Sequence, residues 1–313
     1  VSHAHGDPLQ IETLNLRAPL MGEVEVTLKA CAICHSDIHF AEGAWGGKLP
    51  AVYGHEAAGH VTAIGEGTRG LAIGDPVVVT LIRACGTCAT CGGGMPVLCS
   101  APAAHDGPLT TLDGAPVEQA MNSGAFAEKV VVDQSQIVKL PADMDLVAAS
   151  LLACGVITGV GAVVNAAGLR AGQDVVVIGA GGVGLNAIQG ARIAGARRII
   201  AVVIVTVGAI PAYDTAAQYL APGGKIIMVG MPHSGATSSY QPVMIAASGQ
   251  AMIGSKMGDV VIARDIPWLV DLYQQDRLKL DELVSRTWTL DQINDAIADT
   301  KSGAAKRNVI VFD

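Results

Sequence analysis

Short runs of alternating hydrophobic and polar positions fill the first 150 residues. Residues 23–30 alternate, which places two valines and a leucine on one face, and residues 77–81 and 126–132 are further apolar runs of strand length. Glycine and proline repeatedly interrupt the sequence between these runs. This pattern predicts a mostly β unit built from short strands and many turns.

The pattern changes after about residue 150. Residues 174–178 are a continuous apolar run, followed by Gly-Ala-Gly-Gly-Val-Gly at 179–184, a helical stretch at 185–194 and a second apolar run at 198–202. A strand, helix and strand joined by such short connections indicate a parallel sheet.

The last third of the chain continues this sheet and then turns helical. Residues 225–230 predict another buried strand, residues 267–275 and 291–299 predict helices, and residues 308–312 predict a final strand. The sequence therefore predicts an α/β protein with a mostly β first part.

The composition excludes several classes of protein. Half of the residues are hydrophobic and 15% are charged, which is unlike a disordered chain, and a net charge of −8 argues against an electrostatic nucleic-acid binder. An uncharged, mostly apolar stretch at residues 146–169 has the length of a membrane span, but Ser, Cys, Gly, Thr and Asn interrupt it and no Lys/Arg cluster flanks it. We therefore expect a buried region of a soluble protein rather than a membrane span.

No basic segment followed by an apolar core opens the sequence, so we expect no secretory signal and a cytoplasmic location. In such a protein, seven cysteines indicate a metal site or catalysis before disulfides.

Four cysteines lie close together in a glycine-rich segment, with the spacing C-x2-C-x2-C-x7-C; they are Cys85, Cys88, Cys91 and Cys99. Four thiolates at such spacings can close a tetrahedral Zn²⁺ site, and a site with four protein ligands leaves no open position. The sequence therefore predicts a structural zinc. Buried free thiols or a redox pair are the alternative, which four cysteines in so short a segment disfavour.

A second set of candidate metal ligands is scattered along the chain: Cys34, His55 and Cys154. Three nitrogen and sulfur ligands plus a water are typical of a catalytic zinc. Spacing alone does not join these three residues, and a lone buried Cys or His is more often an ordinary core residue.

Four segments, in order, resemble one family over nearly the whole chain. They are Cys34-His-Ser-Asp, Gly54-His-Glu-Ala-Ala-Gly, the four-cysteine run, and the Cys154 segment followed by Gly-Ala-Gly-Gly-Val-Gly. The chain resembles the zinc-dependent alcohol dehydrogenases of the medium-chain dehydrogenase/reductase family. Thr68 departs from the small aliphatic residue usual at its position, and Cys31 matches no motif and is expected in the core.

The resemblance implies a role for each matching residue. Cys34, His55 and Cys154 would bind the catalytic zinc, with Glu56 behind it. Asp37 would hold the imidazole of His55 in one tautomer. Two further residues, Ser36 and His39, match the family's proton relay to solvent. Trp45 and Leu81 are candidates for the substrate pocket.

The glycine-rich run predicts a nucleotide-binding loop, because it follows a strand and opens a helix. Gly179 would make the tight turn, Gly181 would let the backbone approach a pyrophosphate, and Gly184 would allow close packing of the helix. A glycine-rich turn without a ligand is the alternative. The residues expected at the cofactor, several of them from the resemblance, are His35, Thr158, Gly179, Gly181, Gly182, Val183, Gly184 and Arg307.

The acidic residue that should follow the glycines by about 20 positions, to bind the adenosine ribose, is missing. Residues 197–208 contain no Asp or Glu, and by resemblance the end of a second strand runs directly into a fourth strand at Val202/Val203. Roughly 50 residues of helix and strand belong between them, judged from typical element lengths. We expect a segment left out of this sequence rather than a true deletion.

The expected architecture is a GroES-like, mostly β catalytic domain, residues 1–155 and 258–313, with an incomplete doubly wound Rossmann-type domain at 156–257. The expected activity is interconversion of an alcohol and an aldehyde or ketone by hydride transfer with NAD or NADP, with two zinc ions per chain. A thiol-adduct formaldehyde or polyol dehydrogenase is the alternative within the family. A zinc-binding structural protein with a lost cofactor site is the alternative of another class. The family also implies a homodimer or homotetramer in which the strand at 252–255 pairs across a two-fold axis.

Overall fold

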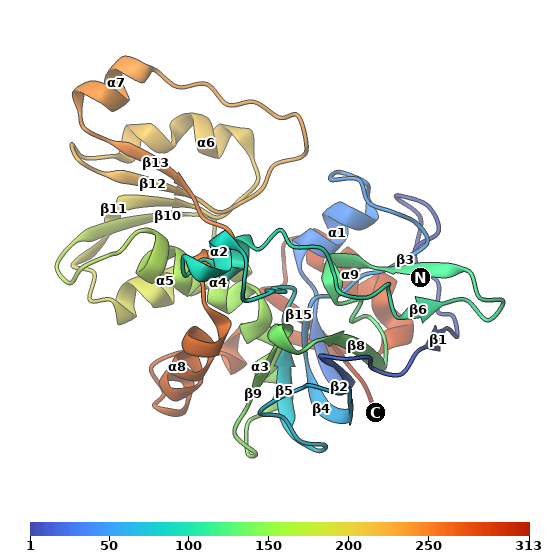
Figure 1. Ribbon diagram of the computed structural model, residues 1–313. Coiled ribbons are helices and arrows are strands. Elements are labelled where there is room, and N and C mark those ends of the chain that lie inside the picture. Colours follow the sequence, from blue (N-terminus) through green and yellow to red (C-terminus); the bar gives the residue numbers. More distant parts are fainter. The chain divides into compact units, whose positions relative to one another are not determined.

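The computed structural model describes the backbone of all 313 residues and the side chains of all but residues 199–202 (Figure 1). Its contacts divide the chain into two compact units. Unit 1 comprises Val1–Cys154, Ile262–Asp271 and Leu280–Asp313, and unit 2 comprises Gly155–Val261 and Leu272–Lys279.

The division differs from the sequence-based one at residue 155, at residues 258–261 and at residues 272–279, all of which belong to unit 2 rather than to the catalytic part. The Gln189 side chain explains the last of these differences: its amide nitrogen donates to the Lys279 carbonyl oxygen at 3.0 Å, and its oxygen accepts from the Lys279 backbone nitrogen at 2.7 Å. This pair of hydrogen bonds ties the segment to the nucleotide-binding side of the chain.

A seven-stranded sheet forms the centre of unit 1, in the order β14-β15-β2-β4-β5-β9, with β8 also paired to β2. Alternation along β2 (Glu23–Ala32) buries Val24, Val26 and Leu28 completely, as the pattern predicts. The other strands are β4 (Glu56–Ile64), β5 (Pro76–Val79), β8 (Lys129–Asp133), β9 (Ile137–Lys139), β14 (Val284–Trp288) and β15 (Arg307–Val311).

A smaller sheet of four short strands completes the β structure of unit 1, in the order β1-β6-β7-β3. These strands are β1 (Asn15–Leu16), β3 (Ala51–Val52), β6 (Leu109–Thr110) and β7 (Pro116–Gln119).

Short helices connect the strands of unit 1, and α8 continues into unit 2. The α-helices are α1 (His35–Ala41), α2 (Ala89–Gly92), α3 (Leu146–Ser150), α8 (Ile262–Gln274) and α9 (Ile293–Lys301). Single turns are η1 (Pro96–Leu98), η2 (Ala120–Asn122), η3 (Gln134–Gln136), η4 (Leu151–Ala153), η8 (Asp281–Leu283) and η9 (Leu290–Gln292). Helix α8 begins five residues before the predicted start, so Pro267 lies inside the helix rather than at its first position.

Unit 2 is built on a parallel sheet in the order β10-β11-β12-β13. Its strands are β10 (Asp174–Ile178), β11 (Arg198–Val205), β12 (Lys225–Met228) and β13 (Ala251–Gly254). Its helices are α4 (Gly155–Gly161), the π-helical η5 (Ala162–Ala166), α5 (Gly182–Ile193), α6 (Ile210–Ala216), η6 (Ala217–Tyr219), α7 (Pro242–Ala247) and η7 (Met257–Asp259). Of the strand expected at 198–202, only Arg198 has a described side chain.

Helices cover both faces of this sheet. On one face Ala187 and Ala191 of α5 pack with residues of η5 against the side chains of Val175, Ile204 and Ile227. On the other face Ala216 of α6 packs against Val203, Val205 and Ile226. The α/β class with a parallel sheet is therefore confirmed.

Helices α4 and α5 approach each other closely. A Cβ atom on Gly159 would lie 2.4 Å from the Val183 carbonyl oxygen, so only glycine permits this approach.

In the part of the chain that the structure describes, no single helix is long and apolar enough to cross a membrane. The helical segments 146–153 and 155–166 reach that length and apolarity only when taken together, and the chain bends between them.

Candidate active site

Four buried side chains from separate segments of unit 1 converge on one point. The ligand atoms of Cys34, His55, Glu56 and Cys154 all lie within 4.8 Å of one another. The cysteine at 34 is the residue before α1, the histidine and the glutamate stand where β4 begins, and the cysteine at 154 follows η4. The fold thus joins the three residues that spacing alone could not.

Asp37 orders this cluster. One oxygen of its carboxylate, Oδ1, lies 2.9 Å from His55 Nδ1 and also accepts from the Gly54 backbone nitrogen at 2.9 Å. The other oxygen, Oδ2, accepts from the Cys34 backbone nitrogen at 3.0 Å. The carboxylate therefore fixes the start of α1, the approach to β4 and the ring of His55 together, and the contact expected between Asp37 and His55 is present.

The second nitrogen of the His55 ring is aimed at the cluster. Nε2 is buried and has no hydrogen-bond partner among the described residues. A buried polar atom without a partner is costly, and two cysteine sulfurs stand beside it. Two thiolates and one imidazole nitrogen are the ligand set of a catalytic zinc site, so the residues fit this ion.

The pKa values of Cys34 and Cys154 are shifted in opposite directions. The hydrogen bond from Cys154 lowers the pKa of Cys34 well below its usual value, and the same contact, together with burial, raises the pKa of Cys154 well above it. Burial alone would lower the pKa of His55, but the adjacent Asp37 carboxylate outweighs burial and the net pKa is raised. Cys34 is thus the cysteine of this pair that loses its proton more readily.

Glu56 forms a buried ion pair with Arg307. Burial raises the pKa of Glu56 to about 7, although the guanidinium beside it acts in the opposite direction. Arg307 is only 6% exposed and stands at the start of β15. The resemblance places Arg307 at the cofactor pyrophosphate, and nothing in the sequence indicates its ion pair with Glu56. The cofactor contact stays a prediction.

The two expected relay residues lie on α1. Ser36 Oγ is 3.6 Å from Cys34 Sγ, and His39 is half-buried with its ring centroid 4.9 Å from that of Trp45. Burial lowers the pKa of His39, which favours the neutral imidazole. His35 is exposed on the same helix.

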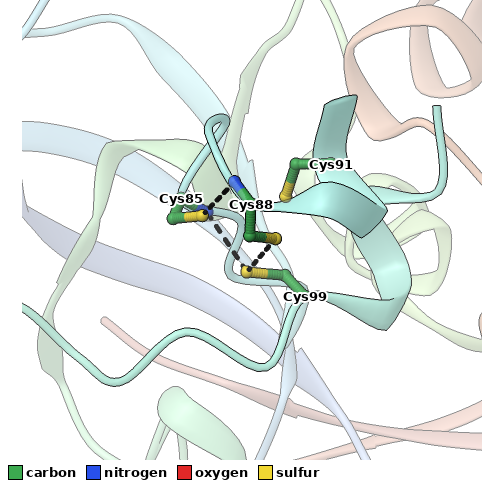
Figure 2. Close-up of side chains that lie close together, drawn as sticks. All are labelled: Cys85, Cys88, Cys91 and Cys99. Atoms are coloured by element: carbon green, nitrogen blue, oxygen red, sulfur yellow. Dashed lines mark hydrogen bonds between the residues drawn. The ribbon is translucent and has the colours of Figure 1, made fainter. Parts of the chain in front are cut away.

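The four-cysteine cluster is local and partly exposed. Figure 2 shows the side chains of Cys85, Cys88, Cys91 and Cys99 gathered around α2. Cys88 Sγ is 3.9 Å from Cys99 Sγ, and backbone nitrogens donate to two of the sulfurs: Cys88 N to Cys85 Sγ at 3.3 Å and Cys85 N to Cys99 Sγ at 3.4 Å. Four sulfurs so placed fit a tetrahedral zinc without an open position.

Arg83 supports the segment that follows this cluster, and sequence reasoning missed it. One of its guanidinium nitrogens donates to the Pro102 carbonyl oxygen at 2.9 Å, and the other donates to the carbonyl oxygen of Ala101. An arginine two residues before the first cysteine is the only signal in the sequence, and it does not reveal the partner.

The glycine-rich loop of unit 2 has the geometry of a phosphate-binding turn. Gly179 has a φ of +109°, and Gly181 is the residue before α5. A Cβ atom on Gly184 would lie 2.0 Å from the Gly179 carbonyl oxygen, whereas a Cβ on Gly181 would meet no atom within 4 Å. The loop therefore packs tightly at Gly184 and leaves open space at Gly181. This space lies beside the first turn of α5, where free backbone N–H groups can bind an anion. The loop fits the phosphates of a dinucleotide.

The remaining expected cofactor residues are placed as follows. Gly182 and Val183 are the first two residues of α5, and Thr158 is a buried residue of α4 whose hydroxyl donates to Met257 Sδ at 3.7 Å. Their contact with a cofactor stays a prediction.

Residues 21–142 match the family model of the alcohol dehydrogenase GroES-like domain. The chain is 31% identical to the NDMA-dependent alcohol dehydrogenase of Amycolatopsis methanolica, over 99% of this chain and 97% of the relative. The chain belongs to the alcohol dehydrogenases of the medium-chain dehydrogenase/reductase family. The S-(hydroxymethyl)glutathione dehydrogenase of Paracoccus denitrificans is 30% identical over 98% of this chain and 97% of that relative. The chain described here is therefore an oxidoreductase of small-molecule alcohols and aldehydes.

Solved structures agree with this assignment. An alcohol dehydrogenase zinc-binding domain protein from Burkholderia ambifaria superposes with a TM-score of 0.94 at 29% identity, covering 100% of this chain and 97% of that one. Benzyl alcohol dehydrogenase from Acinetobacter calcoaceticus gives a TM-score of 0.92 at 26% identity, covering 100% and 98%. The GroES-like plus Rossmann-type architecture expected from the sequence is therefore confirmed.

Proposed function

We propose that this chain is a zinc-containing, NAD(P)-dependent alcohol dehydrogenase with one catalytic and one structural zinc. One observation carries the proposal above all: the buried cluster of Cys34, His55 and Cys154, in which His55 Nε2 faces two sulfurs and has no hydrogen-bond partner among the described residues. The four-cysteine cluster supports the second zinc.

The chain's own residues provide binding, orientation and proton transfer. Zinc, when bound, supplies a Lewis acid and the nicotinamide supplies a hydride acceptor. Cys34, His55 and Cys154 hold the metal, and Asp37 keeps the His55 ring oriented with Nε2 toward it. Ser36 takes the proton of the alcohol hydroxyl and His39 passes it to water.

His39 suits this last step because burial lowers its pKa, so that the neutral imidazole is available to accept a proton near neutral pH. Glu56 lies behind the cluster, where Arg307 holds it in an ion pair.

For the cofactor we propose that the loop from Gly179 to Gly184 binds the pyrophosphate at the start of α5. Thr158 packs near the nicotinamide, and His35 and Arg307 contact the pyrophosphate. NAD is the expected cofactor and NADP is the alternative.

The substrate is open within the class of alcohols and carbonyl compounds. Trp45 lies beside His39 and, with Leu81, is proposed to line the substrate pocket. The named activity of the Paracoccus denitrificans relative supports a thiol adduct of formaldehyde as the alternative substrate, and a polyol is the second alternative. We further propose a cytoplasmic homodimer or homotetramer that pairs through β13, because this strand has a partner on one side only among the described residues.

Metal analysis and a substrate panel test the proposal. We expect two zinc ions per chain and NAD(P)-linked oxidation of simple or aromatic alcohols, with S-(hydroxymethyl)glutathione and a polyol as the comparison substrates. Size-exclusion chromatography with light scattering reports the oligomer. A protein that binds zinc but neither binds NADH nor oxidises any substrate would contradict the proposal and support a zinc-binding structural protein.

A further inference from the structure

Leu81 leaves the central sheet of unit 1 beside the buried cluster. In the antiparallel pairing of β5 with β4, Val79 stands opposite Ala57. Two residues further along each strand, this register brings Leu81 level with His55. The sheet therefore supports the place beside the cluster that the resemblance gives to Leu81 as a residue of the substrate pocket.

Gln136 holds the Leu81 segment from the β9 side of β5. Its side chain is 1% exposed, and Nε2 donates to the Thr80 carbonyl oxygen at 2.8 Å and to the Asn122 carbonyl oxygen at 2.9 Å. The Gln136 carbonyl oxygen in turn accepts from the Thr80 backbone nitrogen at 2.9 Å. One buried amide thus joins two loops that are distant in sequence, and it uses both of its N–H groups to do so.

The second of these loops contains a strained turn. Met121 and Asn122 have φ angles of +52° and +56°, in the left-handed region that residues with a side chain rarely adopt. The buried Ser123 hydroxyl lies 3.3 Å from the carbonyl oxygens of Met121 and Thr80. A conformation of this kind persists only where its surroundings impose it, and Gln136 and Ser123 supply the contacts that do so.

The turn is bonded both to Leu81 and to the segment that carries His55. Asn122 Nδ2 donates to the Leu81 carbonyl oxygen at 3.3 Å. The Ala125 backbone nitrogen donates to the carbonyl oxygen of Gly54, the residue before His55, at 2.8 Å. Hydrogen bonds therefore connect Gln136, through the turn, to the protein around the buried cluster.

A cavity borders this network. Gln136 and Asn122 line a space of about 680 Å³ within unit 1, together with Gln119 and residues 103–110 among others. In a close-packed interior the neighbouring side chains hold a group in place. Beside a cavity the hydrogen bonds carry more of this task, so their loss should let the turn move.

We propose that Gln136 is a positioning residue for the substrate: it fixes Leu81 and the strained turn, and thereby determines how tightly bulky alcohols bind. The inference rests on the alcohol dehydrogenase function proposed above. It predicts that an aromatic alcohol, whose ring reaches the wall formed by Leu81, depends on Gln136, whereas ethanol is too short to reach this wall and does not.

Gln136→Met tests the proposal with a side chain of similar volume that has no donor. The wild-type and variant enzymes, loaded with zinc and NAD, are compared with benzyl alcohol and with ethanol. We expect the KM for benzyl alcohol to rise about tenfold, while its kcat and the KM for ethanol stay within about twofold. An equal loss of kcat/KM for both alcohols would overturn the proposal, because it would reflect general damage to the structure.

Gln134→Met is the matched control. Gln134 belongs to the same turn, η3, but its side-chain oxygen accepts from the Arg69 backbone nitrogen at 3.0 Å, so the variant should leave both KM values unchanged. A Leu81→Ala background shows whether Gln136 acts through Leu81. In that background Gln136→Met should change the KM for benzyl alcohol by less than about twofold, and a full tenfold effect would contradict the proposal.

Hydrogen exchange provides a measurement without turnover. Gln136→Met should speed amide exchange in residues 80–84 and 120–125, where the backbone nitrogens of Thr80 and Ala84 are hydrogen-bonded in the wild-type protein. Exchange in β4 should not change. Faster exchange throughout unit 1 would show a general loss of stability and would count against a positioning role.

Asn122→Gly decides the question if Gln136→Met does not fold. Glycine accepts the left-handed backbone, so this variant removes only the hydrogen bond to Leu81. The KM for benzyl alcohol should rise about threefold and that for ethanol should not change; equal KM values in variant and wild type would overturn the inference. A wild-type protein that oxidises neither alcohol would instead contradict the proposed function itself.

Discussion

The two cysteine clusters of unit 1 are built in opposite ways. The four-cysteine cluster comes from one glycine-rich segment, and all four of its cysteines are partly exposed. The other cluster draws Cys34, His55 and Cys154 from segments separated by up to 120 positions and buries all three. The first is a property of a local segment, whereas the second is a property of the whole fold of unit 1.

This difference separates what each cluster can do. A buried ligand set with three donors leaves one position of a tetrahedral ion for a substrate, and the surrounding protein excludes water. A closed set of four thiolates has no such position, so the zinc proposed there would only hold the segment together. Loss of a ligand should therefore abolish activity at the buried cluster and reduce stability at the four-cysteine cluster.

The largest effect is expected for Cys154→Ala. The variant loses a ligand from the buried cluster, so turnover should fall by well over the roughly 100-fold that loss of a group behind the ligands causes, while the fold remains. Steady-state kinetics, zinc content and circular dichroism measure the three quantities. Cys31→Ala is the matched control, because Cys31 is a fully buried residue of β2, three positions before Cys34, yet does not belong to the cluster. Retained turnover in Cys154→Ala would refute the ligand assignment.

Cys91→Ala should instead act on stability. Structural zinc contributes on the order of 10 kcal/mol to the folding of small zinc peptides, so the segment around α2 should unfold locally and become sensitive to protease when one thiolate is removed. Activity measured before proteolysis should fall much less than in Cys154→Ala. Ser100→Ala, an exposed change next to Cys99, provides the control. Loss of activity at full zinc content would contradict a purely structural role.

Asp37→Asn should have an intermediate effect. The amide keeps the shape of the side chain but cannot serve as a charged acceptor for both His55 Nδ1 and the two backbone nitrogens. Zinc affinity of the buried cluster or kcat/KM should fall about 10- to 100-fold, as is typical for a carboxylate behind a histidine ligand. Competition with a chelator measures the zinc affinity, and the four-cysteine zinc serves as an internal reference. Asp133→Asn, at a capping carboxylate of the same unit, should change neither.

The contrast between the clusters also explains what the sequence could predict. The four-cysteine site follows from its spacing alone, and the strand at 174–178 and the glycine-rich turn after it follow from hydrophobic runs and one glycine motif. The buried cluster could be assembled only through a family resemblance, because its ligands are brought together by β4, α1 and η4 rather than by sequence distance.

Other pairings between distant side chains could not be predicted from the sequence or the resemblance. The ion pair of Arg307 with Glu56 depends on β15 lying beside β2, which in turn pairs with β4. The hydrogen bonds of Gln189 to Lys279 move a domain boundary that composition did not mark. The opposite faces of α5 and α6 show, in the same way, that the order of elements along the chain does not give their positions around the sheet.

Arg83 tests whether the exposed cluster depends on support from outside its own segment. Its guanidinium donates to the carbonyl oxygens of Ala101 and Pro102, directly after the last cysteine, and Cys99 is held from the other side by the Cys85 backbone nitrogen. Arg83→Met keeps much of the side-chain volume and removes both hydrogen bonds from a charged donor, which should cost about 1–2 kcal/mol at this partly exposed position. The thermal midpoint and the rate of proteolysis near residue 100 measure the effect.

Arg69→Met is the matched control for this variant, because Arg69 is exposed on another turn of the same unit. If Arg83 fixes the exit of the segment, Arg83→Met should speed proteolysis and zinc loss at the four-cysteine cluster and leave the zinc of the buried cluster, and the KM for alcohol, unchanged. Equal loss of zinc from both clusters would mean that the exposed cluster is not an independent local structure. The difference between a local site and a site made by the whole fold would then not hold.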